Sequence, residues 1–282
     1  MDKTLHRQKT IPIVIRDSNE LRINIILSPK TYNLQQVNVT GEHPVKWKRQ
    51  LEFFKKYFLG NNEFAVNCDI KNETILNFSE NNTLFIASAD EPLQIVNNAF
   101  GYKLECVLGK FTFDKKRQIS SFEVYPQFHE IIPATQDSLE DYVSNREDAY
   151  RGSVANFLQV ISNPEKDFSK EGFKLYYLED RSFIGQIYTA DEIVEHYPKL
   201  GFCYLTSNNG SMSRFGEESS GIKIYYNKDG YQRVSTIYFH DETGAEFDPA
   251  GYFTSLHQFY IYGYWAKEGV ATMLPRFWEP KD

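Results

Sequence analysis

The hydrophobic pattern divides the chain into a β segment, a helix, a longer β segment, a second helix and a mixed remainder. Over 21–28, leucine and isoleucine alternate with mostly polar residues, a period of two that is typical of a half-buried strand. Apolar positions within 11–15 and 34–39 predict two further strands. Because three strands make a poor core by themselves, we expect residues 1–40 to be the end of a larger β-sandwich.

A helical period replaces the strand pattern after the break at 41–44. One apolar face recurs at spacings of four, three and four residues and is formed by Trp47, Leu51, Phe54 and Phe58. Pro44 suits the first turn of a helix and Gly60 suits its C-terminal cap. The sequence therefore predicts one helix between these two residues.

Between residues 72 and 128 the pattern returns to strands. Short polar pairs such as Asn81–Asn82 and Lys115–Lys116 mark turns between them, and the spacing predicts an antiparallel meander. Aromatic residues such as Phe111 and Phe122 fit cross-strand pairing. The predicted strands lie at 75–78, 83–87, 93–96, 102–113 and 119–125.

A second, longer helix is predicted from Ser138 to Ile161. Asp137 and Glu140 have the spacing of a capping box, with Asp in the role of Ser or Thr, and Asn163–Pro164 ends the pattern. Gly152 interrupts the apolar stripe at a cost of about 1 kcal/mol. This glycine therefore marks either a kink or a close packing contact.

The rest of the chain mixes strands and short helices. Strands are predicted at 173–178, 202–206, 222–226 and 234–239, and short helices at 191–196 and 267–274. The predicted fold class is α+β. Residues 1–40 would be the C-terminal strands of a β-sandwich, and residues 41–282 a β-rich antiparallel domain with one long helix.

Charge and apolar run length restrict the partners. The net charge of the 282 residues is −7, which argues against nucleic acid because phosphate-backbone binding needs a concentrated cationic surface. The main basic cluster, at 46–49 and 55–56, falls on the first predicted helix and is interpreted as a solvated face. No apolar run approaches the roughly 18 residues of a membrane-spanning helix.

The three cysteines and the known catalytic motifs add little chemistry. Cys68, Cys106 and Cys203 include no C-x-x-C pair, so we interpret them as small buried residues. The sequence lacks the H-E-x-x-H, G-x-S-x-G and glycine-rich phosphate-loop patterns, and we predict neither a metal nor a cofactor. His240–Asp241–Glu242 could ligate a metal, but the following Thr243–Gly244 favours a solvated turn.

Two functional hypotheses stay open beside a purely structural role for these residues. A pair of carboxylates that cleaves glycosides depends on separation in space, so an unrecognised hydrolase is one of them. The other is glycan binding, because exposed rings near the end of the chain can stack on sugars. The candidate ligand-binding residues are Tyr252, Tyr260, Tyr262, Tyr264 and Trp265.

Four stretches, taken together, resemble a known family. They are LRINIILSP (21–29) with 34–39, FKKYFLG (54–60) with 68–72, ADEPLQIVNNAFGY (89–102), and REDAYRGS (146–153), with an echo at 263–265 and 270–275. They are similar, in matching order over nearly the whole chain, to Bacteroidetes-type proteins that contain a carboxypeptidase-like regulatory domain. The similar region follows the transthyretin-like β-sandwich of that family. The resemblance implies no peptidase activity.

The resemblance also implies a setting and a role. It implies a non-enzymatic cell-envelope protein, a binding or assembly module in the periplasm or at the outer-membrane periphery, whose partner is an envelope protein or a glycan. Family members carry a signal peptide and a complete sandwich ahead of this region, so we expect an N-terminal truncation.

The family-motif residues Arg146, Tyr150, Arg151 and Gly152 are expected to be structural. The two arginines lie on a helix that is predicted to be mostly buried. They would need acidic partners there, because an unpaired buried charge is costly. The candidate partners are Asp90, Glu91 and Glu147.

Overall fold

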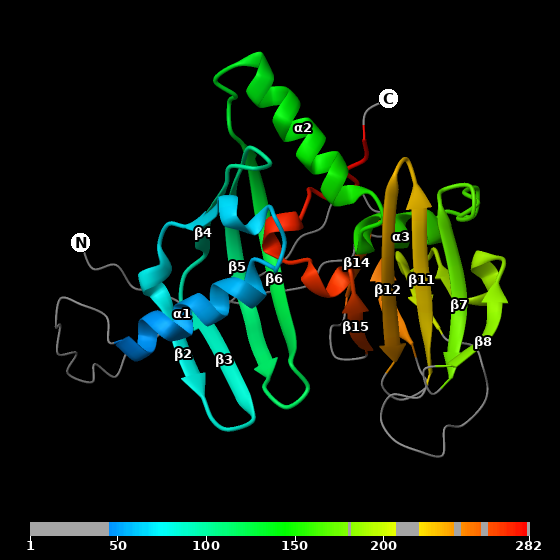
Figure 1. Cartoon of the computed structure of the whole chain (residues 1–282), viewed down its shortest axis with the longest axis horizontal. Helices are drawn as coiled ribbons and strands as arrows, with labels where there is room; N and C mark the ends of the chain where they lie inside the picture. Colours follow the sequence, from blue (N-terminus) through cyan, green and yellow to red (C-terminus); the bar gives the residue numbers. More distant parts are fainter. Residues whose placement is uncertain (1–44, 180–181, 207–219, 240–243, 255–258, 281–282) are drawn as a thin grey trace.

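Two hydrophobic cores organise the molecule, one in each half of the chain (Figure 1). The computed structural model describes residues 45–179, 182–206, 220–239, 244–254 and 259–280. These residues form three antiparallel sheets and three α-helices, which confirms the β-rich α+β class. The sandwich strands predicted within 1–40 lie outside the described residues.

A six-stranded antiparallel sheet forms the first core. Its strands are β1 (Cys68–Ile70), β2 (Leu76–Glu80), β3 (Leu84–Ala89), β4 (Leu93–Asn97), β5 (Tyr102–Asp114) and β6 (Ile119–Glu130), with 3₁₀ turns η1 (Ala65–Asn67) and η2 (Glu73–Ile75) beside them. The five strands predicted between 72 and 128 are confirmed, but the meander is wrong. Strands β3 and β4 do not pair with each other; both pair with β5. Because β5 is 13 residues long, β4 pairs along 102–106 and β3 along 111–114 of the same edge.

Helix α1 (Val45–Phe58) covers this sheet and supplies aromatic residues to the first core (Figure 1). Phe54 and Phe58 are fully buried, and the ring of Phe54 contacts that of Phe111 edge-on at 4.9 Å between centroids. Phe111 lies opposite Phe122 in the β5–β6 ladder, as predicted. Gly60 ends the helix with a φ of +102°, a left-handed conformation that favours glycine.

The second predicted helix is in fact two helices. Helix α2 (Gln136–Tyr150) and helix α3 (Val154–Ser162) are separated at Gly152, which has a φ of +67°. A Cβ added to this glycine would lie 2.5 Å from Cδ1 of Tyr226, so the turn has room only for hydrogen. Thr135, and not Asp137, caps α2 by accepting a hydrogen bond from the backbone nitrogen of Ser138 at 3.1 Å.

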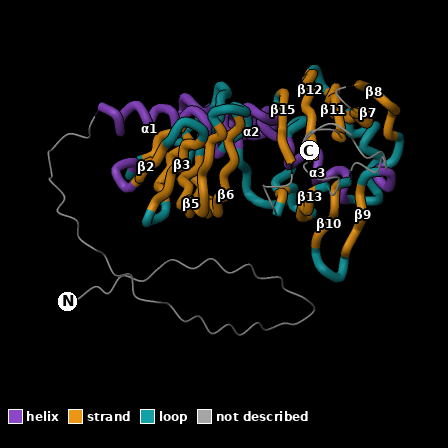
Figure 2. Tube along the Cα trace, turned by 90° about the horizontal axis from the view of Figure 1, so that it is seen from below, coloured by secondary structure: helices purple, strands orange, loops and turns teal. Residues whose placement is uncertain are grey.

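The second core lies between two antiparallel sheets that enclose α3 (Figure 2). Four of the six buried residues of α3 are apolar, namely Phe157, Leu158, Val160 and Ile161. The five-stranded sheet has the order β15-β12-β11-β7-β8 and the four-stranded sheet the order β14-β13-β10-β9.

All four strands predicted after residue 165 are confirmed among the nine strands of these two sheets. The five-stranded sheet contains β7 (Phe173–Glu179), β8 (Ser182–Ile187), β11 (Ser220–Lys228), β12 (Tyr231–Phe239) and β15 (Phe259–Gly263). The four-stranded sheet contains β9 (Val194–Tyr197), β10 (Phe202–Leu205), β13 (Ala245–Asp248) and β14 (Tyr252–Phe253).

The two short helices predicted in this half are wrong in extent. At 191–196 a single 3₁₀ turn, η3 (Ala190–Glu192), leads into β9, because pairing with β10 extends the backbone from Val194 onward. At 267–274 there are two 3₁₀ turns, η4 (Trp265–Lys267) and η5 (Val270–Thr272). An extended Gly269 separates them.

The end of the chain returns from the second core to the first. Val270, Ala271 and Leu274 are buried in the first core. The backbone nitrogen of Ala271 donates to the carbonyl of Leu59 at 3.1 Å, and Nδ2 of Asn97 donates to the carbonyl of Ala271 at 2.9 Å. The two cores are therefore linked twice, through α2–α3 and through this returning segment.

The prediction that the three cysteines are small buried residues is confirmed. All three cysteines are buried and free. Burial raises the pKa of the Cys68 and Cys106 thiols to about 12, which keeps them protonated and unreactive at neutral pH. In the described part of the chain, no helix is both long and apolar enough to cross a bilayer.

We expect Gly152→Ala to lower the free energy of unfolding by about 1–3 kcal/mol, because alanine resists a left-handed φ and its Cβ meets Tyr226. Urea unfolding followed by circular dichroism measures the change. Gly185→Ala is the matched control, because Gly185 has open space around its Cα and no left-handed φ. Equal effects of the two substitutions would contradict this account of Gly152.

Candidate functional site

The two cores meet at a junction formed by residues 146–153, residues 264–268 and Arg233 of β12. The guanidinium of Arg233 is buried, and its Nη2 donates to the carbonyl oxygen of Asp148 at 2.7 Å and to Oδ1 at 3.2 Å. Its Nη1 donates to the carbonyl oxygen of Arg151. One side chain thus satisfies carbonyl groups that helix α2 leaves free at its C-terminal end.

The family-motif residues make structural contacts in and beside this junction. Nε of Arg146 donates to the carbonyl of Phe100 at 2.8 Å, and the guanidinium carbon lies 3.9 Å from the centroid of the Tyr102 ring. The carboxylate partner of Arg146 is Glu130, at 3.4 Å, which is not among the three predicted candidates. Arg146 therefore ties α2 to the first sheet.

The other three motif residues contact α3, α2 and the turn between β11 and β12. The hydroxyl of Tyr150 donates to Oε1 of Gln159 at 2.6 Å. Arg151 forms ion pairs with Asp229 and with Glu147, the latter at 3.6 Å and as predicted. The nitrogen of Gly152 donates to Oδ1 of Asn156 at 2.9 Å. These contacts fix the angle between α2 and α3.

Trp265, a candidate ligand-binding residue, lies inside the junction. Its side chain is 3% exposed, its Nε1 donates to the carbonyl oxygen of Gly152 at 2.8 Å, and its ring packs on Phe157 with centroids 5.2 Å apart. Contrary to the sequence prediction, Trp265 belongs to the core and offers no ring for stacking.

Tyr252 and Tyr264, two further candidates, are half-buried and hold other parts of the chain. The hydroxyl of Tyr252 donates to the carbonyl of Leu274, and burial raises its pKa to about 12. The Tyr264 ring lies under Arg233, with 4.1 Å between guanidinium carbon and centroid, and burial raises its pKa well above the usual 10. Both rings are already used within the fold.

The pKa of Glu268, in the junction, is shifted toward neutral pH. Its Oε1 accepts a hydrogen bond from the backbone nitrogen of Val154, at the start of α3, at 3.4 Å. Desolvation raises its pKa to about 8, although this hydrogen bond and the nearby Arg233 act in the opposite direction. Glu268 therefore contacts the start of α3 mainly as a protonated carboxyl group at neutral pH.

The other two candidates, Tyr260 and Tyr262, lie on the outer face of the five-stranded sheet. Tyr262 pairs with Thr236, which pairs with Lys223, and residues opposite each other in a ladder share one face. The outer face carries the aromatic residues Tyr176, Phe183, Tyr225, Tyr238, Tyr260 and Tyr262, and we call it the aromatic face.

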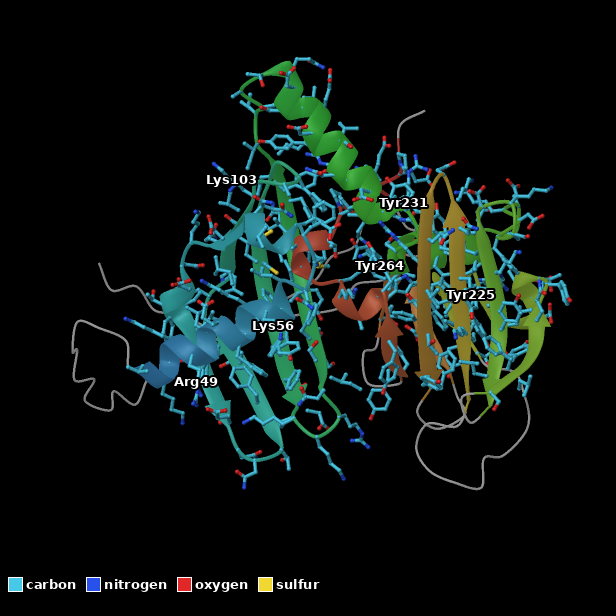
Figure 3. The ribbon with its side chains drawn as sticks, viewed as in Figure 1. Arg49, Lys56, Lys103, Tyr225, Tyr231 and Tyr264 are labelled. Atoms are coloured by element: carbon cyan, nitrogen blue, oxygen red, sulfur yellow. The ribbon has the colours of Figure 1, made fainter. Side chains whose placement is uncertain are left out.

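This face is open to solvent in the described part of the chain. Figure 2 shows α3 and the four-stranded sheet on the opposite side, and Figure 3 shows Tyr225 on the uncovered side of β11. Phe183 is 53% exposed and Val234 is 41% exposed. Both apolar side chains are therefore available to contact a partner.

Three rings and a lysine form the centre of the aromatic face. Tyr176 stands nearly perpendicular to both Phe183 and Tyr225, with centroid distances of 5.4 and 5.6 Å. The Nζ of Lys223 lies 4.8 Å from the centroid of Phe183 and 5.4 Å from that of Tyr225. The ammonium thus rests on the electron-rich faces of two rings.

Beside these rings the face is hollowed, with a volume of about 890 Å³. Among the described residues of its lining, Lys174 contributes a cationic side chain and none contributes a carboxylate, although the whole chain carries a net charge of −7. The lining also includes Arg233, but its guanidinium is buried on the other side of the sheet, at the end of α2. Its lining comprises Ser169, Gly172, Lys174, Tyr176, Phe183, Tyr225, Tyr226, Asn227, Gln232, Arg233 and Val234.

The sequence reasoning missed most of this face, although one signal was present. Along β11, Lys223 and Tyr225 alternate with the buried Ile222, Ile224 and Tyr226. The strand was predicted, but the alternation of apolar and polar residues does not show which face of the strand another layer covers.

Comparisons with protein families, curated proteins and solved structures find no match to this chain. Within the described residues, no group of three or more His, Cys, Asp and Glu could hold a metal ion. The sequence candidate His240–Asp241–Glu242 lies outside those residues.

We expect the stability of the chain to fall as the pH rises from about 4.5 to about 8, in part because of Glu268. Its folded-state pKa is raised, so in this window the folded chain binds a proton that the unfolded chain has released. Glu268→Gln should reduce the fall in unfolding free energy across this pH window by at least about 1 kcal/mol, since one pKa unit corresponds to about 1.4 kcal/mol.

Urea unfolding at several pH values measures the slope. Glu105→Gln is the matched control, because Glu105 is exposed on β5 and far from the junction in the sequence. A wild-type slope that survives unchanged in Glu268→Gln would show that other groups cause it.

Proposed function

We propose that this chain is a non-enzymatic binding or assembly module of the cell envelope, and that it binds its partner through the aromatic face. The observation that carries the proposal is the set of rings on the outer side of the five-stranded sheet, beside a hollow of about 890 Å³. Burying such rings on a partner supplies much of the free energy of association in known interfaces.

The envelope setting is supported by the family resemblance. The stretches at 54–60, 89–102 and 146–153 carry it within the described residues. They include residues of α1 and β4, which belong to the first core, and residues of the junction between the two cores. A scaffold of this kind presents the aromatic face rigidly, which lowers the entropic cost of binding.

The non-enzymatic part is supported by the roles of the titratable groups in the junction. Arg233, Asp148, Arg151 and Asp229 bind one another or the helix end, and Glu268 accepts from the start of α3. Groups that already bind other parts of the chain favour a structural role over proton transfer to a substrate.

A glycan is the alternative partner favoured by a specific observation. Tyr260 and Tyr262 extend the aromatic face along β15, so the rings spread across the sheet from β7 to its far edge. Rings spread over an open sheet suit an extended ligand better than a compact one.

We expect the purified chain to co-sediment with insoluble envelope fractions of its host, and Tyr225→Ala to reduce the bound fraction several-fold. The loss of a ring from the centre of the aromatic face removes both contact area and the platform of Lys223. Densitometry of bound and free protein measures the effect.

Tyr125→Ala is the matched control, because Tyr125 is 43% exposed on β6 of the other sheet. Immunoblots of host-cell fractions test the location of the chain independently. Recovery of the chain in the cytosolic fraction alone would overturn the envelope setting, and equal binding by both variants would overturn the role of this face.

A further inference from the structure

The chemistry of the aromatic face points to a ligand with apolar surfaces and negative charge. Lys174 lies opposite Tyr225 in the ladder between β7 and β11, and Lys223 lies opposite Tyr176. Each of these two rings therefore has a cation as its cross-strand neighbour. Neither lysine forms an ion pair within the described part of the chain.

The position of Lys223 shows how an anion could be received. Its ammonium rests on the rings of Phe183 and Tyr225 at the end of a flexible four-carbon stem. The stem can turn so that the ammonium meets a carboxylate, and the ring faces are then free for a ligand. The attraction of an ammonium to aromatic rings in contact with solvent is weak, so this exchange costs little free energy.

The rim of the hollow adds groups that suit hydroxyls. Asn227 and Gln232 face each other across the β11–β12 ladder, and both are exposed. An amide side chain offers two donors and one acceptor oxygen, which matches the mixed donor and acceptor character of neighbouring sugar hydroxyls. Ser169 adds a hydroxyl on the same lining.

We propose, building on the binding role above, that the aromatic face binds an acidic carbohydrate chain, one that contains uronic-acid units. The apolar C–H faces of the sugar rings pack on Tyr176, Phe183 and Tyr225, since an aromatic ring is negative on its face and attracts such hydrogens. Carboxylates of the ligand pair with Lys174 and Lys223. Asn227 and Gln232 bind hydroxyls.

The observations favour this ligand over single-stranded nucleic acid, which also combines rings with negative charge. A nucleic-acid groove follows a phosphate at every nucleotide with a continuous line of cations. Among the described cations in or beside the hollow, Lys174 and Lys223 form no ion pair, whereas Arg233 is bound to the end of α2 and Lys228 to Glu171. The net charge of −7 adds a repulsive background for a polyanion.

The test is isothermal titration of the whole chain with three probes, namely oligogalacturonate, a neutral malto-oligosaccharide and oligothymidylate. We expect oligogalacturonate to bind best, with an affinity that falls as salt is added. Tyr225→Ala should weaken it about tenfold or more, and Lys223→Gln by roughly five- to tenfold with a smaller salt dependence.

Tyr125→Ala and Lys56→Gln are the matched controls and should bind like the unaltered chain, because Tyr125 belongs to β6 and Lys56 to α1, outside the five-stranded sheet. Thermal unfolding of every variant separates lost binding from lost folding. Val234→Thr changes one exposed group on the face and provides a second binding measurement if Tyr225→Ala folds poorly.

Two groups of results would overturn the inference. Equal affinity for the neutral and acidic probes would overturn the choice of an acidic ligand, as would binding of oligothymidylate alone. Binding of oligogalacturonate that survives Tyr225→Ala and Lys223→Gln would overturn the site. Either result is compatible with envelope co-sedimentation, so the proposed binding role fails only if that separate measurement fails.

Discussion

The guanidinium of Arg233 holds the two halves of the molecule in register by binding carbonyl oxygens at the end of α2. A helix leaves its last carbonyl groups without internal partners, and burying them unpaired costs free energy. Arginine presents several donors in one plane and stays charged, so it satisfies both Asp148 and Arg151 from a neighbouring strand. The Tyr264 ring beneath it completes the packing.

The turn at Gly152 depends on the same arrangement. Its left-handed φ lets α3 leave α2 sharply, and its carbonyl receives the indole of Trp265 from the returning end of the chain. Helix α3 is thereby directed between the two sheets of the second core. Because α3 covers the inner side of the five-stranded sheet, the outer side with its rings is the one left to solvent.

The charges of the molecule serve two different purposes. In the junction, and on α1, cations are paired with carboxylates of the chain, as for Arg151 with Asp229 and Lys55 with Glu73. On the aromatic face, Lys223 instead rests on aromatic rings. Pairing with rings leaves its charge available to a ligand, and the binding role proposed for this face rests on that difference in local environment.

The sequence by itself determined the class of the fold and most strand positions. Period-two and helical spacing report local burial, so the strands of the first sheet and the apolar face of α1 could be predicted. Only the tertiary structure decided the remainder. The break between α2 and α3, the sharing of one β5 edge by β3 and β4, and the burial of Trp265 all depend on contacts between residues distant in sequence. The site depends on them too, because alternation along β11 marks two faces and only the placement of α3 decides which face remains exposed.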